Sequence, residues 1–217
     1  LLNEIFSPLK EQIQTYNKRL IENEASVKTS IENMVKYSNA MSANAEKLAQ
    51  ILKGDKKIRG NFGEIQLKSV LENSGLIEGE QYKLQENLSL EGSRYIPDAI
   101  IYLERDKSII IDAKFSLPSD FSFENMGEQV GVELAKNLCS RIDELSKKPY
   151  DKLSSYDFVL LFIPYQNILD LALSAKPSLY QYAYDKKVYL TTPHTLFMAL
   201  KTIQITWINI DKSENVS

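Results

Sequence analysis

The stretch from Tyr95 to Phe115, YIPDAIIYLERDKSIIIDAKF, constrains the fold of this chain more than any other. Its two apolar runs are joined by a polar segment at 104–107, a pattern that predicts two buried strands connected by a turn. An unpaired buried charge costs several kcal/mol or neutralises itself. Asp98, Asp112 and Lys114 nevertheless lie in or beside these runs. The sequence therefore predicts that other groups compensate these three charges.

The spacing of these charged residues allows two interpretations. Side chains alternate across a strand, so Asp112 and Lys114 share a face, and Asp98 joins them if the two strands pair antiparallel. Two carboxylates and one ammonium group suit a hard divalent cation such as Mg²⁺, with the lysine beside a metal-bound water. A buried Asp–Lys ion pair with a solvated Asp98 accounts for the spacing equally well. Spacing alone leaves both open.

The residues around the strands carry a family resemblance. Pro97-Asp98 followed by Asp112-x-Lys114 resembles the signature of the restriction-endonuclease-like nuclease superfamily. Taken in order, the flanking segments resemble the RmuC family of bacterial DNA recombination proteins over nearly all of residues 54–210. These segments are GNFGEIQLKSVLENSGL (60–76), YKLQENL (82–88), RIDELSKKPY (141–150), FVLLFIP (158–164) and VYLTTPHTLFMALKTIQITW (188–207).

The resemblance implies a part in DNA recombination that limits DNA rearrangement, without fixing the reaction. The leading hypothesis is a metal-dependent DNA nuclease. Asp98 and Asp112 would bind Mg²⁺ or Mn²⁺, and Glu64 would join them as a ligand or supporting group. Lys114 would orient the attacking water. Without the resemblance, Glu64 in the first turn of a helix would only complement the helix dipole.

Two glutamines are carried over from the same resemblance as groups that support the site or contact the substrate. Gln85 matches a glutamine of the family pattern. Gln166 stands where the family usually carries an acid, shortly after the proline of the FIP strand. A glutamine can orient water or phosphate, but it brings no charge to a metal ion. Glu64, Asp98 and Asp112 therefore remain the available carboxylates.

The densest positive cluster precedes the helix expected at 61–74, for which Asn61 is the predicted cap and Phe62, Ile65, Val70 and Leu71 are the predicted inward residues. The members of this positive cluster are Lys53, Lys56, Lys57 and Arg59. Positive charges near a helix start can hold a DNA phosphate backbone, although a basic loop is more often merely solvated. Net charge is −3, so any DNA binding must depend on such a local patch.

The remaining patterns predict the order of the elements. We expect a strand at 82–90, the hairpin, a helix at 129–147, a strand at 156–164, helices at 167–175 and 178–184, a strand at 188–191 and a helix at 193–210. This order favours an α/β fold with a mixed sheet and helices on both faces. It agrees with the restriction-endonuclease-like core implied by the resemblance, within a nuclease-like domain at 54–217.

Residues 1–53 are expected to form a separate helical arm. Apolar residues recur there at spacings of three and four from Leu2 to Leu52, a narrow heptad stripe typical of a coiled coil. At about 1.5 Å per residue the helix would be far longer than the globular part. It therefore packs on a second chain, as a homo-oligomer, or folds back as a hairpin. Because the chain starts without Met and stops at a polar tail, we expect it to be truncated at both ends.

Composition narrows the remaining possibilities. Cys139 and His194 are the only residues of their types, so neither an internal disulfide nor a Cys/His zinc site is possible within the chain, and we expect a cytoplasmic setting. No apolar run has the length of a membrane span. Two rivals to a nuclease stay open: a DNA-binding or scaffold protein of recombination whose nuclease fold no longer cuts, and a coiled-coil adaptor.

Overall fold

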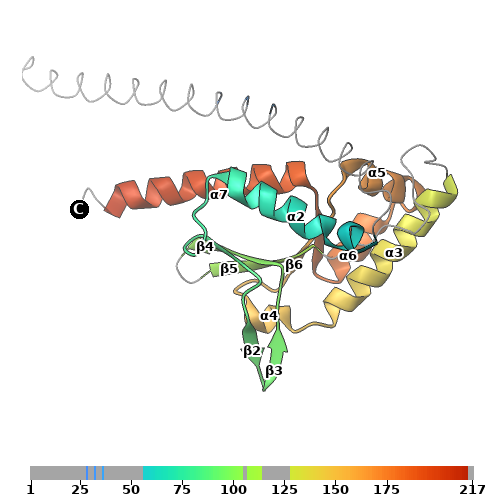
Figure 1. Cartoon of the computed structure of the whole chain (residues 1–217), viewed down its shortest axis with the longest axis horizontal. Coiled ribbons are helices and arrows are strands. Elements are labelled where there is room, and N and C mark those ends of the chain that lie inside the picture. The colour runs from blue at the N-terminus through green and yellow to red at the C-terminus, as the bar shows by residue number, and fades with distance from the viewer. Residues whose placement is uncertain are drawn as a thin grey trace, which may run out of the picture. The chain divides into compact units, whose positions relative to one another are not determined.

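The computed structural model describes residues 28, 32, 36, 56–104, 107–113 and 128–214 (Figure 1). The chain divides into two compact units, residues 1–40 and 41–217. In the first unit the description is limited to Lys28, Glu32 and Lys36, which are helical and exposed. The predicted arm at 1–53 otherwise lies outside the described residues, as do Lys53 and Lys114.

The second unit alternates helices and short strands. In chain order these are α2 (Lys56–Ser74), β1 (Tyr82–Leu84), β2 (Leu88–Leu90), β3 (Ser93–Tyr95), β4 (Ala99–Glu104), β5 (Lys107–Asp112), α3 (Glu128–Ser146), α4 (Tyr150–Leu153), β6 (Val159–Phe162), α5 (Gln166–Ala175), α6 (Leu179–Asp185), β7 (Val188–Thr191) and α7 (Pro193–Glu214). None of the described helices is both long and apolar enough to cross a membrane.

The strands form a five-stranded mixed sheet in the order β1-β4-β5-β6-β7, and β2 pairs with β3 in a separate two-stranded sheet. β4 pairs antiparallel with β1 and β5, whereas β6 runs parallel to β5 and β7. The predicted hairpin and the predicted mixed α/β class are therefore confirmed.

Helices cover both faces of this sheet (Figure 1). α2 packs against α7, and α3 packs against α5 and α6. The core cluster joins Ile110 of β5 and Val159 of β6 to Leu138 and Ile142 of α3, all of them buried. Alternation along β5 therefore turns Ile110 and Asp112 toward the side covered by α3.

The first helix differs from the prediction in two respects. It begins at Lys56, so Asn61 lies within it and is not its cap, and Lys56, Lys57 and Arg59 lie on a helix rather than in a loop. Straight-chain lysine and arginine are good helix formers, which favours this earlier start. Ile65, predicted inward, is 51% exposed, because the buried stripe of the helix follows Phe62, Leu67, Val70 and Leu71.

The predicted strand at 82–90 is interrupted. Gln85 adopts a left-handed backbone with a φ of 47°, which ends β1 and separates it from β2. A non-glycine residue takes up this conformation only where surrounding contacts hold it there.

Candidate functional site

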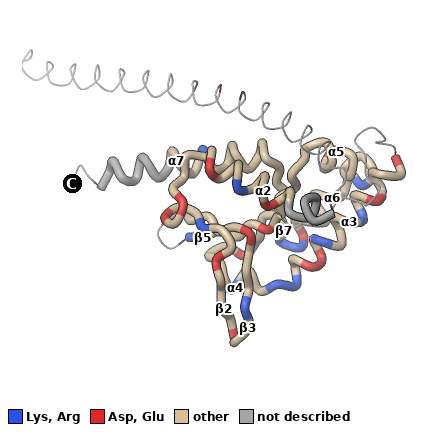
Figure 2. Tube along the Cα trace, in the orientation of Figure 1, with Lys and Arg blue, Asp and Glu red and all other residues tan. Residues whose placement is uncertain are grey.

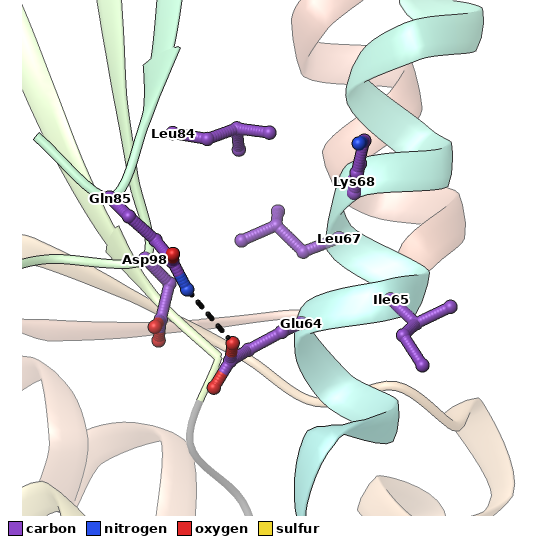
Figure 3. Close-up of a pocket in the computed structure, with 7 residues that line it drawn as sticks. All are labelled: Glu64, Ile65, Leu67, Lys68, Leu84, Gln85 and Asp98. Carbon is purple, nitrogen blue, oxygen red and sulfur yellow. Dashed lines mark hydrogen bonds between the residues drawn. The ribbon is translucent and has the colours of Figure 1, made fainter. Parts of the chain in front are cut away.

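A cavity of about 310 Å³ opens between α2 and the adjoining ends of β1 and β4. Its lining residues are Glu64, Ile65, Leu67, Lys68, Leu84, Gln85 and Asp98 (Figure 3). Three of the residues predicted for the site are among them. Figure 3 shows the carboxylates of Glu64 and Asp98 approaching one another from the helix and from the strand side.

Close packing of α2 around Gly63 positions Glu64. A Cβ atom on Gly63 would lie 2.3 Å from the carbonyl oxygen of Ala113, so only glycine lets the helix approach the end of β5 this closely. On the preceding residue, the ring of Phe62 stacks on Tyr165 with centroids 5.0 Å apart. Glu64 is thereby placed beside the end of the strand that carries Asp112.

Gln85 connects the two walls of the cavity. Its Nε2 donates to Oε2 of Glu64 over 3.1 Å, and its backbone N–H donates to the carbonyl oxygen of Asp98 over 3.1 Å. These two bonds hold Gln85 in the left-handed conformation, because one fixes its side chain and the other fixes its backbone N–H. The prediction from sequence named Gln85 but placed it in a regular strand.

Asp98 is 5% exposed and accepts a hydrogen bond at Oδ2 from the backbone N–H of Ala113, over 2.7 Å. The β4–β5 register pairs Ala99 with Ile111, so one step further along the hairpin Asp98 lies across from Asp112. Residues directly opposite in an antiparallel pair share a face. The register thus brings the backbones of the two aspartates near one another, although Asp112 is not among the residues that line the cavity.

Asp112 is compensated by two cations that the sequence analysis did not select. Its side chain is 2% exposed, with Oδ1 at 2.5 Å from Nη2 of Arg141 on α3 and Oδ2 at 3.4 Å from Nζ of Lys148. Arg141 also pairs with Glu144. Burial opposes the charge of Arg141, but Asp112 and Glu144 outweigh it, so the pKa of the guanidinium lies above its ordinary value.

Tyr150 completes this group of donors. Its side chain is buried, and its hydroxyl lies 3.4 Å from Nζ of Lys148. Burial, followed by the negative charges of Asp112 and Asp98, raises the pKa of the phenol far above its ordinary value. Tyr150 is therefore a neutral hydroxyl at any physiological pH. The segment RIDELSKKPY contains all three residues and was the only signal in the sequence that pointed to them.

The donors of the cavity suit a hard cation. Glu64 and Asp98 provide two carboxylates, and Mg²⁺ in proteins commonly takes one or two carboxylates together with water and phosphate oxygens. Among the described residues no group of three or more His, Cys, Asp or Glu side chains is arranged to hold a metal ion. Glu64 and Asp98 are the carboxylates of the cavity, whereas both oxygens of Asp112 contact cations, Arg141 and Lys148.

Gln166 lies apart from this cavity. Its Oε1 accepts from Oγ1 of Thr192 over 2.8 Å, and its Nε2 donates to Oδ1 of Asp170 over 2.9 Å. The contact with Thr192 joins α5 to the end of β7, whereas the contact with Asp170 lies within α5, and Gln166 is not among the residues that line the cavity. In this structure Gln166 ties two elements together.

Three members of the predicted basic cluster, Lys56, Lys57 and Arg59, lie on the same helix as Glu64. Elsewhere in the described part of the chain, acidic and basic positions are interspersed rather than separated into one basic face (Figure 2). DNA binding would therefore depend on local groups of cations, such as the first turns of α2 or the pair Arg141 and Lys148.

Comparison with known proteins gives consistent matches over the whole chain. The model of the RmuC family matches residues 1–217. The DNA recombination protein RmuC homolog of Vibrio cholerae is 35% identical over 99% of this chain and 45% of its own length. The homolog of Pseudomonas aeruginosa is 34% identical over 99% and 51%, and RmuC of Escherichia coli 33% over 99% and 48%. The chain thus spans about half the length of these relatives. No solved structure matches it.

Proposed function

Because this chain belongs to the RmuC family, we propose that it carries the metal-dependent nuclease centre of a DNA recombination protein, on a restriction-endonuclease-like core. The observation that supports this most directly is the shared cavity of Glu64 and Asp98, with Asp112 across the hairpin from Asp98. Two carboxylates from separate segments line one cavity, and a third lies across the strand pair. Such an arrangement is costly for stability alone, because each buried charge must be compensated.

In this proposal each residue has a defined task. Asp98 and Asp112 hold Mg²⁺ or Mn²⁺, Glu64 completes the set of ligands, and Gln85 keeps Glu64 in place through its side-chain hydrogen bond. A bound divalent ion lowers the pKa of water and offsets phosphate charge. Lys114, which lies outside the described residues, orients the attacking water. It is a poor base, because neighbouring carboxylates favour its protonated form.

The test is cleavage of linear, nicked and single-stranded DNA in Mg²⁺ by the full chain and by two variants, Asp112→Asn and Lys114→Ala. Loss of one catalytic group typically lowers the rate by about 10²–10⁴-fold. Both variants should therefore lose cleavage while retaining the wild-type circular dichroism spectrum. If metal-dependent cleavage survives both substitutions, the proposed centre is wrong.

A second function is favoured by one specific observation. Both oxygens of Asp112 contact cations of the chain, as expected for a structural ion pair. A protein in which Asp112 serves only a structural ion pair would bind DNA in recombination without cutting it. Salt-sensitive DNA binding with no turnover in Mg²⁺ or Mn²⁺ would favour this alternative.

A further inference from the structure

The contacts with Asp112 do not use all the hydrogen-bond donors of Arg141 and Lys148. Arg141 is 12% exposed and bonds Asp112 and Glu144 through its terminal nitrogens. Its Nε is buried and donates to no acceptor among the described residues. A buried donor without an acceptor costs about 1–3 kcal/mol, so it marks a place where an acceptor oxygen would be stabilised.

Lys148 and Tyr150 bring further donors to the same place. Nζ of Lys148 lies 3.4 Å from both Asp112 and the Tyr150 hydroxyl, and the Lys148 side chain is 27% exposed. A distance of 3.4 Å is long for a charge-assisted hydrogen bond. The ammonium group is therefore positioned near Asp112 without being committed to it, and it has a route to solvent.

We propose that Arg141, Lys148 and Tyr150 form a phosphate subsite, and that these groups move from Asp112 to a phosphodiester of DNA when a divalent cation binds beside Asp112. The inference rests on the proposed function, since it assumes a metal ion and DNA at this site. It assigns Arg141 and Lys148 two successive partners: Asp112 in the metal-free protein and the substrate phosphate in the loaded one.

The chemistry of the donors favours a phosphodiester. A guanidinium presents several N–H donors in a fixed fork that matches two phosphate oxygens, and an ammonium adds a compact positive charge. The neutral hydroxyl of Tyr150 can donate a third hydrogen bond. A cation beside Asp112 weakens the attraction between that carboxylate and Arg141, because the two positive groups compete for it. Metal and DNA should consequently assist one another in binding.

This exchange predicts shifts of opposite sign in two affinities. Removing Lys148 takes away a competitor for Asp112, so Ca²⁺ should bind more tightly in the absence of DNA. The same change removes a phosphate contact, so DNA in the presence of Ca²⁺ should bind about tenfold more weakly. Removing Lys148 from a purely structural ion pair would also strengthen Ca²⁺ binding, because a nearby positive charge is lost, but it would weaken DNA binding no more than removal of an exposed lysine such as Lys152.

The experiment uses the full chain and the variants Lys148→Gln and Arg141→Gln. Ca²⁺ affinity without DNA is measured by calorimetry, and affinity for a fluorescent duplex with a single-stranded tail by anisotropy with and without Ca²⁺. Lys152→Gln is the matched control, because the Lys152 side chain is 59% exposed and its Nζ makes only a long contact, of 4.0 Å, with Oε1 of Glu91. We expect tighter Ca²⁺ and weaker DNA binding in Lys148→Gln and Arg141→Gln, and an unchanged Ca²⁺ affinity in Lys152→Gln.

Lys148→Gln keeps the test decisive if Arg141→Gln does not fold, because Lys148 is the more exposed partner. The inference is overturned if wild-type DNA affinity does not respond to Ca²⁺, or if Lys148→Gln binds Ca²⁺ no more tightly than wild type. Its failure is distinguishable from that of the nuclease. If Ca²⁺ affinity rises and DNA affinity falls in Lys148→Gln but the protein never cleaves DNA, the phosphate subsite stands and the nuclease activity is rejected. If the protein cleaves DNA and neither affinity shifts, the nuclease activity stands and the subsite is rejected.

Discussion

Substituting Gly63 by alanine tests how the site is positioned, because the added methyl group would meet the backbone of β5. The new Cβ would lie 2.3 Å from the Ala113 carbonyl oxygen, whereas real Cβ atoms keep at least 3.0 Å from such a neighbour. The part of α2 around Gly63 and the end of β5 must therefore separate by about 0.7 Å or more. Because Glu64 follows directly, it moves away from Asp98 with the helix.

The cost of this substitution has two opposing parts. Overpacking of a close contact typically destabilises by about 1–3 kcal/mol. Alanine within a helix gains about 1 kcal/mol relative to glycine. The free energy of unfolding should therefore fall by about 0–2 kcal/mol, and the melting temperature by up to about 8 °C for a chain of this size. A misplacement of about 1 Å in a catalytic group can cost about 10²-fold in rate.

Melting curves, Ca²⁺ calorimetry and DNA cleavage of Gly63→Ala measure these effects. Gly131→Ala is the matched control, since its Cβ would lie 2.9 Å from the carbonyl oxygen of Leu171 in the packing of α3 against α5. It should lower the melting temperature without changing Ca²⁺ affinity. A Gly63→Ala protein that melts higher than wild type, or that binds Ca²⁺ equally well, would refute the reasoning.

Three further predictions follow from single residues. Gln85→Gly relieves the left-handed backbone but loses the bond to Glu64, so the melting temperature should stay within a few degrees of wild type while calorimetry shows weaker Ca²⁺ binding. Asp98→Asn keeps an acceptor for the Ala113 N–H but loses a charge, so Mn²⁺ should raise the melting temperature of wild type and not of the variant. Burial raises the pKa of Tyr150 and of Tyr165 above the ordinary value of 10.0, so the unfolded chain loses these protons first. The free energy of unfolding should then fall above pH 10, by up to about 1.4 kcal/mol per pH unit for each tyrosine, a slope that Tyr150→Phe should reduce in alkaline denaturation curves.

Local patterns predicted those elements whose residues carry their own signal. The hairpin around Asp98 and Asp112, the helix α3 and the apolar strand β6 all have a period or a composition that few other structures share. The break at Gln85 was missed because its left-handed backbone is held by Glu64 and Asp98, which are distant in the sequence. The early start of α2 was missed because Gly60 and Asn61 resemble a boundary, whereas packing of the following turns continues the helix through them.

The residues of the candidate site likewise divide into those with a local signal in the sequence and those placed by tertiary packing. Asp98, Asp112 and Glu64 were selected because charges beside buried strands need compensation and because their motif resembles a known family. Arg141 was not selected, because nothing near Asp112 in the chain indicates which helix turns a cation toward it. That contact depends on how α3 packs over β5, a tertiary arrangement that periodicity does not encode.

The formal charges give a physical reason for the site to bind metal and DNA together. With Lys114 as the proposed third cation, the formal charges of Arg141, Lys148 and Lys114 equal those of Glu64, Asp98 and Asp112, so the proposed metal-free set is neutral. A divalent ion alone would leave two positive charges in a largely buried region, which is costly. A phosphodiester and a hydroxide together restore neutrality. Metal affinity measured without DNA should therefore be weak, and DNA with a non-cleavable linkage should strengthen it; equal affinities would show that the charges are not coupled.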